Sequence, residues 1–252
     1  MKYLPKLILA CAPFVLLAAC GGGDDLEDRL DVADPVVRFV HASPIAPSLT
    51  LYRGTVAQSD ATNAPYKFAS NYFDVATSAA DWSVKTSTGS VNVGTVTLDP
   101  SRGTKYTFVA LPASSTDSSI YVIEDPYNKP LTSESTHLRL MNASFNASSV
   151  DVYMTGLADD ISPTTLKPLI AATAYKTSGP ASGSDSIDIP GGTYKLTITT
   201  AGTKTVLFTG QLAFGNNQDV LVLTVPDTVL PGAIKALVKI EGVAGATDVP
   251  AL

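Results

Sequence analysis

Histidine, cysteine and tryptophan are scarce in this chain of 252 residues, which has 2 His, 2 Cys and 1 Trp. So few ligating and nucleophilic side chains leave little material for a zinc site, a Cys/His nucleophile or a disulfide framework. Basic residues are in the minority, because 17 Lys and Arg stand against 23 Asp and Glu, and the formal charge is −6. A chain with this balance has no basic stripe to neutralise phosphates, so we expect no nucleic-acid partner.

The signatures of common catalytic sites are also missing. The chain has no Gly-x-Ser-x-Gly elbow, no His-Glu-x-x-His and no phosphate-binding glycine loop before a helix. Asp159 and Asp160 form a carboxylate pair, but adjacent acids in a loop are expected to be solvated. We therefore predict that the protein is not an enzyme and carries no cofactor and no metal.

The N-terminus has the pattern of an export signal. Lys2 and Lys6 precede an apolar run over residues 7–19, which is too short to span about 30 Å of hydrocarbon as a helix. The run ends Leu-Ala-Ala-Cys at 17–20, which resembles the bacterial lipobox. We expect residues 1–19 to be a lipoprotein signal peptide and Cys20 to be acylated, so that the acyl chains make the membrane a partner. Gly21 follows the predicted acylated cysteine, as in lipoproteins that are sorted to the outer membrane. We therefore expect the protein at the outer membrane, on its periplasmic face or at the cell surface.

Residues 20–34 follow as three glycines and a run of acids. A calcium loop would need ordered acidic spacing and a central glycine, and both are absent. We therefore expect a flexible acidic tether between the anchor and the folded part.

Beyond the tether the chain nearly repeats itself at a shift of 101 residues. This shift pairs Arg38 with Arg139 and Tyr52 with Tyr153, together with several small and apolar positions between them. It predicts two copies of about 100 residues, a common size for a small all-β domain. The expected divisions are a first domain at 35–128, a linker at 129–136, a second domain at 137–242 and a loose tail at 243–252.

Both copies have strand-like patterns and turn residues between them. Residues 37–42 and 138–143 are largely apolar on both faces, which favours a central strand over an edge strand. The best helical candidate, residues 161–173, contains Pro163 and Pro168, which argue against a helix. The expected fold is all-β, with two tandem Ig-like antiparallel β-sandwich domains.

The opening of the first copy, Arg-Phe-Val-His-Ala-Ser-Pro-Ile-Ala-Pro at 38–47, resembles the bacterial domain of unknown function 4397 family. The second copy has the Val-Asp-Val-Tyr strand at 150–153 and the Pro-Gly-Gly-Thr-Tyr element at 190–194 that are typical of that family. It departs from the opening motif by Asn142 in place of His and by the loss of both prolines. The resemblance implies an exported, often lipid-anchored, Ig-like β-sandwich, and it implies no activity.

His41 is the natural candidate for chemistry, but the other histidine, His137, is expected at the junction of the linker and the second domain. The repeat pairs His41 with Asn142, which hydrogen-bonds similarly and binds metal poorly, so we expect both to satisfy backbone groups of the following loop. Arg38 and Arg139 are expected to serve the fold, by pairing with an acid or bracing the tyrosine region. The candidate structural loop motif comprises Arg38, His41, Ser43, Pro44, Pro47, Tyr52, Arg139, Asn142 and Tyr153.

Three functions are consistent with these observations. The leading hypothesis is a non-catalytic, lipid-anchored envelope protein that presents loops or strand edges for structural, adhesive or other protein or glycan contacts. The first alternative is a glycan- or small-solute-binding module with a cleft between the domains, lined by Tyr and by Asp159 and Asp160. The second is an envelope hydrolase, which needs two acids converging on one pocket.

Overall fold

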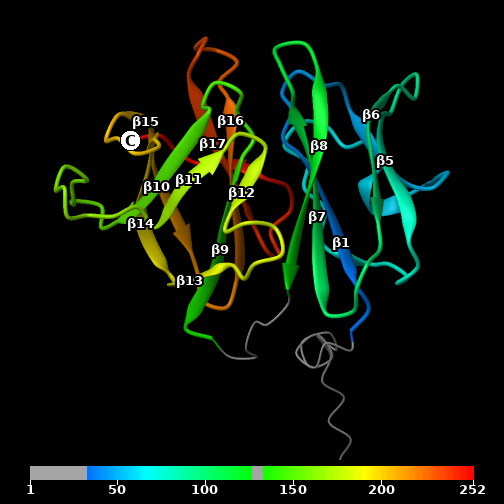
Figure 1. The fold of residues 1–252 in the computed structure, drawn as a ribbon, viewed down its shortest axis with the longest axis horizontal. Helices are drawn as coiled ribbons and strands as arrows, with labels where there is room; N and C mark the ends of the chain where they lie inside the picture. Colours follow the sequence, from blue (N-terminus) through cyan, green and yellow to red (C-terminus); the bar gives the residue numbers. More distant parts are fainter. Residues whose placement is uncertain (1–32, 127–132) are drawn as a thin grey trace, which may run out of the picture.

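A computed structural model describes residues 33–126 and 133–252 of the chain (Figure 1). The predicted signal peptide at 1–19, Cys20 and most of the tether lie outside the described residues. The described part consists of strands and one short 3-10 turn, Ser59–Ala61, which confirms the all-β sandwich class. Within these two ranges, no helix has the length and apolar character needed to cross a membrane.

Four sheets make up the fold. The first sandwich has an outer sheet in the order β3-β2-β5-β6 and an inner sheet in the order β4-β1-β7-β8. The second has an inner sheet in the order β12-β9-β16-β17-β18, with β13 also paired to β9, and an outer sheet in the order β11-β10-β14-β15. The strands of the first sandwich are β1 Val36–His41, β2 Leu49–Arg53, β3 Val56–Ala57, β4 Phe73–Asp74, β5 Ala80–Thr86, β6 Asn92–Leu98, β7 Thr104–Pro112 and β8 Ser118–Pro126. Those of the second are β9 Ser135–Asn142, β10 Ser149–Thr155, β11 Ile170–Ala174, β12 Thr177–Gly179, β13 Ile187–Pro190, β14 Gly192–Thr200, β15 Val206–Phe214, β16 Asp219–Pro226, β17 Ile234–Ile240 and β18 Thr247–Asp248.

The two inner sheets have equivalent topologies. β1 pairs in parallel with β7, and β9 pairs in parallel with β16. The registers also correspond, because Lys105 lies opposite Val36 and Asp219 lies opposite His137, which is 101 residues further along. The inner sheets are therefore mixed, whereas the sequence predicted antiparallel pairing throughout. The hydrophobic pattern of a strand specifies which faces are buried but not the direction of its neighbour.

Each sandwich has its own apolar core. Val37, Phe39 and Trp82 belong to the core of the first sandwich. Leu138 and Leu140 belong to the core of the second. Along β1 and β9, the residues of these cores alternate with residues that point to the opposite face of the sheet, as the two-residue period of a strand requires.

A third core lies between the two inner sheets, which face each other at the centre of the molecule (Figure 1). Val40 on β1 and Ala42 just after it belong to this cluster, and so do the equivalent Met141 on β9 and Ala143 just after it. Leu111 on β7 and Leu223 on β16 also belong to it, and both are fully buried. This arrangement explains why β1 and β9 are apolar on both faces. One face of each strand packs in the core of its own sandwich, and the opposite face packs against the neighbouring sandwich.

Two sequence expectations about segment boundaries need correction. β9 begins at Ser135, inside the expected linker at 129–136, so His137 lies within a strand and is 9% exposed. The expected loose tail at 243–252 is packed, because β18 pairs with β17 and Ala246 and Val249 are buried. Ala246 also donates its backbone N–H to Lys67 O, 2.8 Å away in the first sandwich. Small apolar side chains that complete two cores hold the tail in place.

Candidate functional site: the loop motif and the polar network between the sandwiches

His41 lies at the end of β1 and binds the loop that follows it. Its Nε2 is 3.0 Å from Pro47 O, and its Nδ1 accepts the backbone N–H of Ser43 at 3.3 Å. Burial is the main influence on His41 and lowers its pKa, so the ring is neutral at pH 7. A neutral imidazole with one donor and one acceptor fits these two contacts.

Asn142 makes the corresponding contacts in the second sandwich. Its Oδ1 accepts the backbone N–H of Ser144 at 3.3 Å, and its Nδ2 donates to Ala147 O at 3.0 Å. An amide, like a neutral imidazole, offers one donor and one acceptor group to the backbone. The two side chains therefore close the same turn with different chemistry.

The remaining motif residues also lie in the loops and strands next to these turns. Ser43 is buried, and its hydroxyl is 2.7 Å from that of Ser118 on β8. Pro44 and Pro47 lie in the loop between β1 and β2, where Pro47 supplies the carbonyl that His41 contacts. The Tyr52 and Tyr153 rings are covered by lysine ammonium groups at 4.9 and 4.2 Å, from Lys85 and Lys204 respectively.

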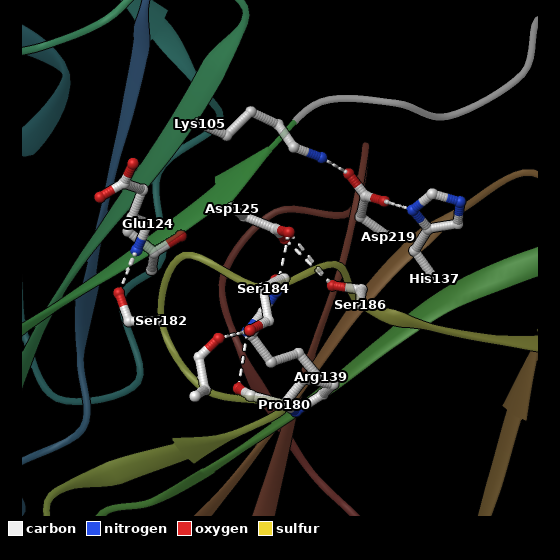
Figure 2. A network of polar contacts seen from close by, with 12 residues as sticks. Lys105, Glu124, Asp125, His137, Arg139, Pro180, Ser182, Ser184, Ser186 and Asp219 are labelled. Atoms are coloured by element: carbon white, nitrogen blue, oxygen red, sulfur yellow. Dashed lines mark hydrogen bonds and ion pairs between the residues drawn. The ribbon is translucent and has the colours of Figure 1, made fainter.

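Arg38 and Arg139 lie away from these tyrosines, on the faces of β1 and β9 that meet between the sandwiches. Arg139 is 3% exposed, and its Nη2 lies 2.9 Å from Asp125 Oδ1 on β8 of the first sandwich. Its Nη1 donates to Pro180 O at 2.7 Å and to Ala181 O at 2.9 Å. The guanidinium therefore joins the two sandwiches through an ion pair and backbone carbonyls (Figure 2).

The loop over residues 180–186, between β12 and β13, completes this contact. Ser182 Oγ accepts the backbone N–H of Glu124 at 2.8 Å, and Gly183 N donates to Glu124 O at 2.9 Å. Ser186 donates to Asp125 at 3.1 Å. The loop thereby covers the outer edge of β8, whose backbone groups would otherwise be open to another strand.

A second ion pair crosses the interface between Lys105 on β7 and Asp219 on β16, whose side chains are 5% and 9% exposed. Burial lowers the pKa of Lys105, but the negative charges around it, Asp219 first and then Tyr72 and Asp125, together outweigh burial and hold the pKa above its ordinary value. His137 extends the network, with Nδ1 at 3.8 Å from Asp219 (Figure 2). Its Nε2 is 3.1 Å from Asp188. Lys105 and Asp219 occupy equivalent positions, so the two copies carry opposite charges where they meet.

Arg38 has a different environment from its equivalent. Its Nε and Nη2 donate to Thr107 Oγ1 at 3.3 and 3.1 Å, and the guanidinium lies 4.5 Å from the centre of the Tyr72 ring. Its Nη1 is buried and has no partner among the described residues. Lys239 on β17 is close enough to Arg38 for the two charges to repel each other.

Asp159 and Asp160 lie elsewhere, on the loop between β10 and β11. They border an open cavity of about 510 Å³ together with Thr155, Pro163, Thr165 and Leu166. The Ser162 hydroxyl and backbone hydrogen bonds lower the pKa of Asp160, which is opposite to what a general acid needs. The sequence predicted a cleft between the domains that is lined by tyrosines and by Asp159 and Asp160. The cavity beside these two acids has no tyrosine in its lining, so the structure does not bring the predicted residues together. Within 33–126 and 133–252, no group of three His, Cys, Asp or Glu side chains has a metal-binding arrangement.

Arg38 and Arg139 were candidate residues from the sequence, but the other buried charges of the interface, Lys105, Asp219 and Lys239, were not. One signal was available, since a charged residue in or next to a strand that is otherwise buried needs a partner. This signal marks Lys105 before the apolar end of β7, Asp219 before the apolar run of β16, and Lys239 within β17.

No curated protein matches the sequence. Among solved structures, the chain is similar to a family CBM26 module of Amy13K from Eubacterium rectale in complex with maltoheptaose, with 11% identity and a TM-score of 0.22, over 84% of this chain and 95% of that one. A TM-score this low carries no inference about function. Residues 35–153, from the start of β1 to Tyr153 in β10, match the family described as "Domain of unknown function (DUF4397)".

Proposed function

We propose that the protein is a non-catalytic interaction module of the bacterial cell envelope, held at the membrane by acyl chains on Cys20. The arrangement of the inner sheets is the observation that carries this proposal. Because β1 and β7 run in parallel, the turn between β7 and β8 lies at the end opposite Val36, where the described chain leaves the tether. The connection between β16 and β17 lies at the same end of the molecule (Figure 1).

This far end has the exposure expected of a contact surface. Val229 and Leu230, in the connection between β16 and β17, are 73% and 61% exposed. Exposed apolar side chains next to one another at a loop tip favour contact with a partner. A lipid anchor at residue 20 would leave this tip facing away from the membrane, towards a protein or a glycan.

Two variants test the anchor. Cys20→Ser should move the protein from the membrane fraction to the soluble fraction of expressing cells, because the thiol that accepts the lipid is lost. Cys11→Ser is the matched control and should leave the fractionation unchanged. If the Cys20→Ser protein stayed fully in the membrane fraction, the anchoring part of the proposal would be wrong. Separation of inner and outer membranes would then test the proposed outer-membrane location.

Glycan binding is the second candidate, and a glycan array of envelope polysaccharides tests it. Binding that is weakened by Val229→Ser and Leu230→Ser, and unchanged by Val206→Ser on exposed β15, would place a glycan partner at the far end. Silence on the array would favour a protein partner.

A further inference from the structure

The pseudo-symmetry of the interface gives each buried arginine an equivalent carboxylate. Asp125 lies opposite Lys105 on β8, and Glu241 bonds through its backbone N–H to Asp219 O at 2.9 Å beside β17. Since Lys105 and Asp219 are equivalent, Asp125 and Glu241 are equivalent too. Arg139 binds Asp125, so the same arrangement would pair Arg38 with Glu241.

The second pair is not formed. Glu241 Oε2 instead accepts the backbone N–H of Asp219 at 3.3 Å. Arg38 is 4% exposed, and its Nη1 is left without an acceptor in the described chain. A buried guanidinium N–H without an acceptor costs free energy, and an oxyanion is the group that satisfies it best.

A cavity of about 200 Å³ adjoins this guanidinium. Arg38 and Lys239 are its buried cations, and Asn71 and Gly242 are exposed where it meets the solvent. The other lining residues are Ser70, Tyr72 and Glu241. The volume is sufficient for a phosphate ion or a small carboxylate, and the exposed residues leave a route to it.

Lys239 adds a second positive charge, which the Glu241 carboxylate in the same cavity lining partly offsets. It is 1% exposed, and its ammonium donates to the Val243 carbonyl. Burial and then the charge of Arg38 lower the pKa of Lys239 to about 8, and together they outweigh the Glu241 carboxylate, which acts to raise it. Two buried cations that repel each other beside a cavity form the electrostatic complement of a bound anion.

We propose that the cavity between Arg38 and Lys239 is a binding site for a small oxyanion, a phosphate or a carboxylate group. The bound oxyanion would take the place that the Asp125 carboxylate has on Arg139, accepting from Arg38 and Lys239 together. The chain as a whole carries a charge of −6, so general attraction does not account for such binding. This proposal does not depend on the anchor or on the contact surface at the far end.

Isothermal titration calorimetry of the purified chain at pH 7 tests this site, with sodium phosphate and sodium acetate as separate probes and sodium chloride at equal ionic strength as the blank. At least one probe should bind saturably. Lys239→Met should weaken that binding about tenfold or more, because one charged donor is lost. Lys235→Gln, on the same strand, is the matched control and should stay within about twofold.

Lys239→Met is expected to fold well, since it replaces a buried cation by an apolar chain of similar length, and far-UV circular dichroism checks this. Binding of phosphate alone would identify a phosphate site, and binding of acetate alone a carboxylate site. Two results would overturn the proposal: no saturable binding of either probe up to about 50 mM, or binding that Lys239→Met leaves unchanged.

Discussion

Arg139 shows how single residues hold the two sandwiches together. Removing one partner of a buried ion pair leaves the other charge without compensation, which costs about 3–5 kcal/mol. Asp125→Asn should therefore lower the free energy of unfolding by about 3 kcal/mol. Urea unfolding measures this, with Asp185→Asn, at an exposed position of the loop over residues 180–186, as the control. Equal stability of the two variants would contradict the role given to the pair.

Lys239 makes a prediction about pH. Its pKa is about 8 in the folded protein and about 10.5 in an unfolded chain, so between these values the unfolded state binds more protons and stability rises with pH. Lys239→Met lacks this titration. The variant should be more stable than the parent at pH 7, and its advantage should shrink by about pH 9.5.

The measurement is the difference in unfolding free energy between variant and parent at the two pH values. Burial raises the pKa of Tyr66 to about 12, but Tyr66 is present in both parent and variant, so its contribution cancels in the difference. A difference that stays constant with pH would mean that Lys239 is not the titrating group.

How much of the site the sequence could predict differs between residues. His41 and Asn142 were expected to bind their following loops, since the turn lies within six residues of each side chain. Partners of Arg38 and Arg139 were not predictable, because Thr107 and Asp125 are distant in sequence. They depend on strand pairing and on packing between sheets, which no local pattern encodes.

The element that best tests the repeat is the turn after β1. His41→Asn should cost less than about 1 kcal/mol, because the amide of Asn142 already closes the equivalent turn in the second sandwich. His41→Ala leaves the loop carbonyl and N–H without a partner and should cost about 1–3 kcal/mol. Thermal unfolding of both variants measures the difference. If asparagine proved as damaging as alanine, the two turns would not be equivalent.

The sequence predicted which segments form strands better than it predicted how those strands pair in sheets. The apolar runs at residues 37–42 and 138–143 were sufficient to indicate the strands β1 and β9. The parallel pairing of β1 with β7 was not predictable, since it depends on which edge of the sheet a strand joins. The tail was expected to be loose because chain termini are often poorly ordered, yet Ala246 and Val249 fill gaps in two cores.

The whole molecule is a stack of four sheets with three apolar layers, and the central layer joins the two sandwiches. The opposite charges of Lys105 and Asp219 favour pairing of the first copy with the second. Two first copies would place lysine against lysine, and two second copies would place aspartate against aspartate. The interface therefore favours assembly within one chain.

The sequence already contained the evidence for this central layer, in strands that are apolar on both faces. From the sequence alone, this pattern predicts a central strand of one sandwich. A sequence pattern shows that a face is covered but not which element covers it. The structure assigns the second face of β1 and β9 to the neighbouring sandwich.

Joint unfolding of the two sandwiches tests this account most directly. Trp82, the one tryptophan of the chain, lies in the core of the first sandwich, and Leu223 lies on the interface face of the second. Leu223→Ala should shift the unfolding transition seen by Trp82 fluorescence, by about 2–5 kcal/mol, together with the transition seen by far-UV circular dichroism. A Trp82 transition that Leu223→Ala leaves in place would show that the sandwiches unfold independently and would contradict the account.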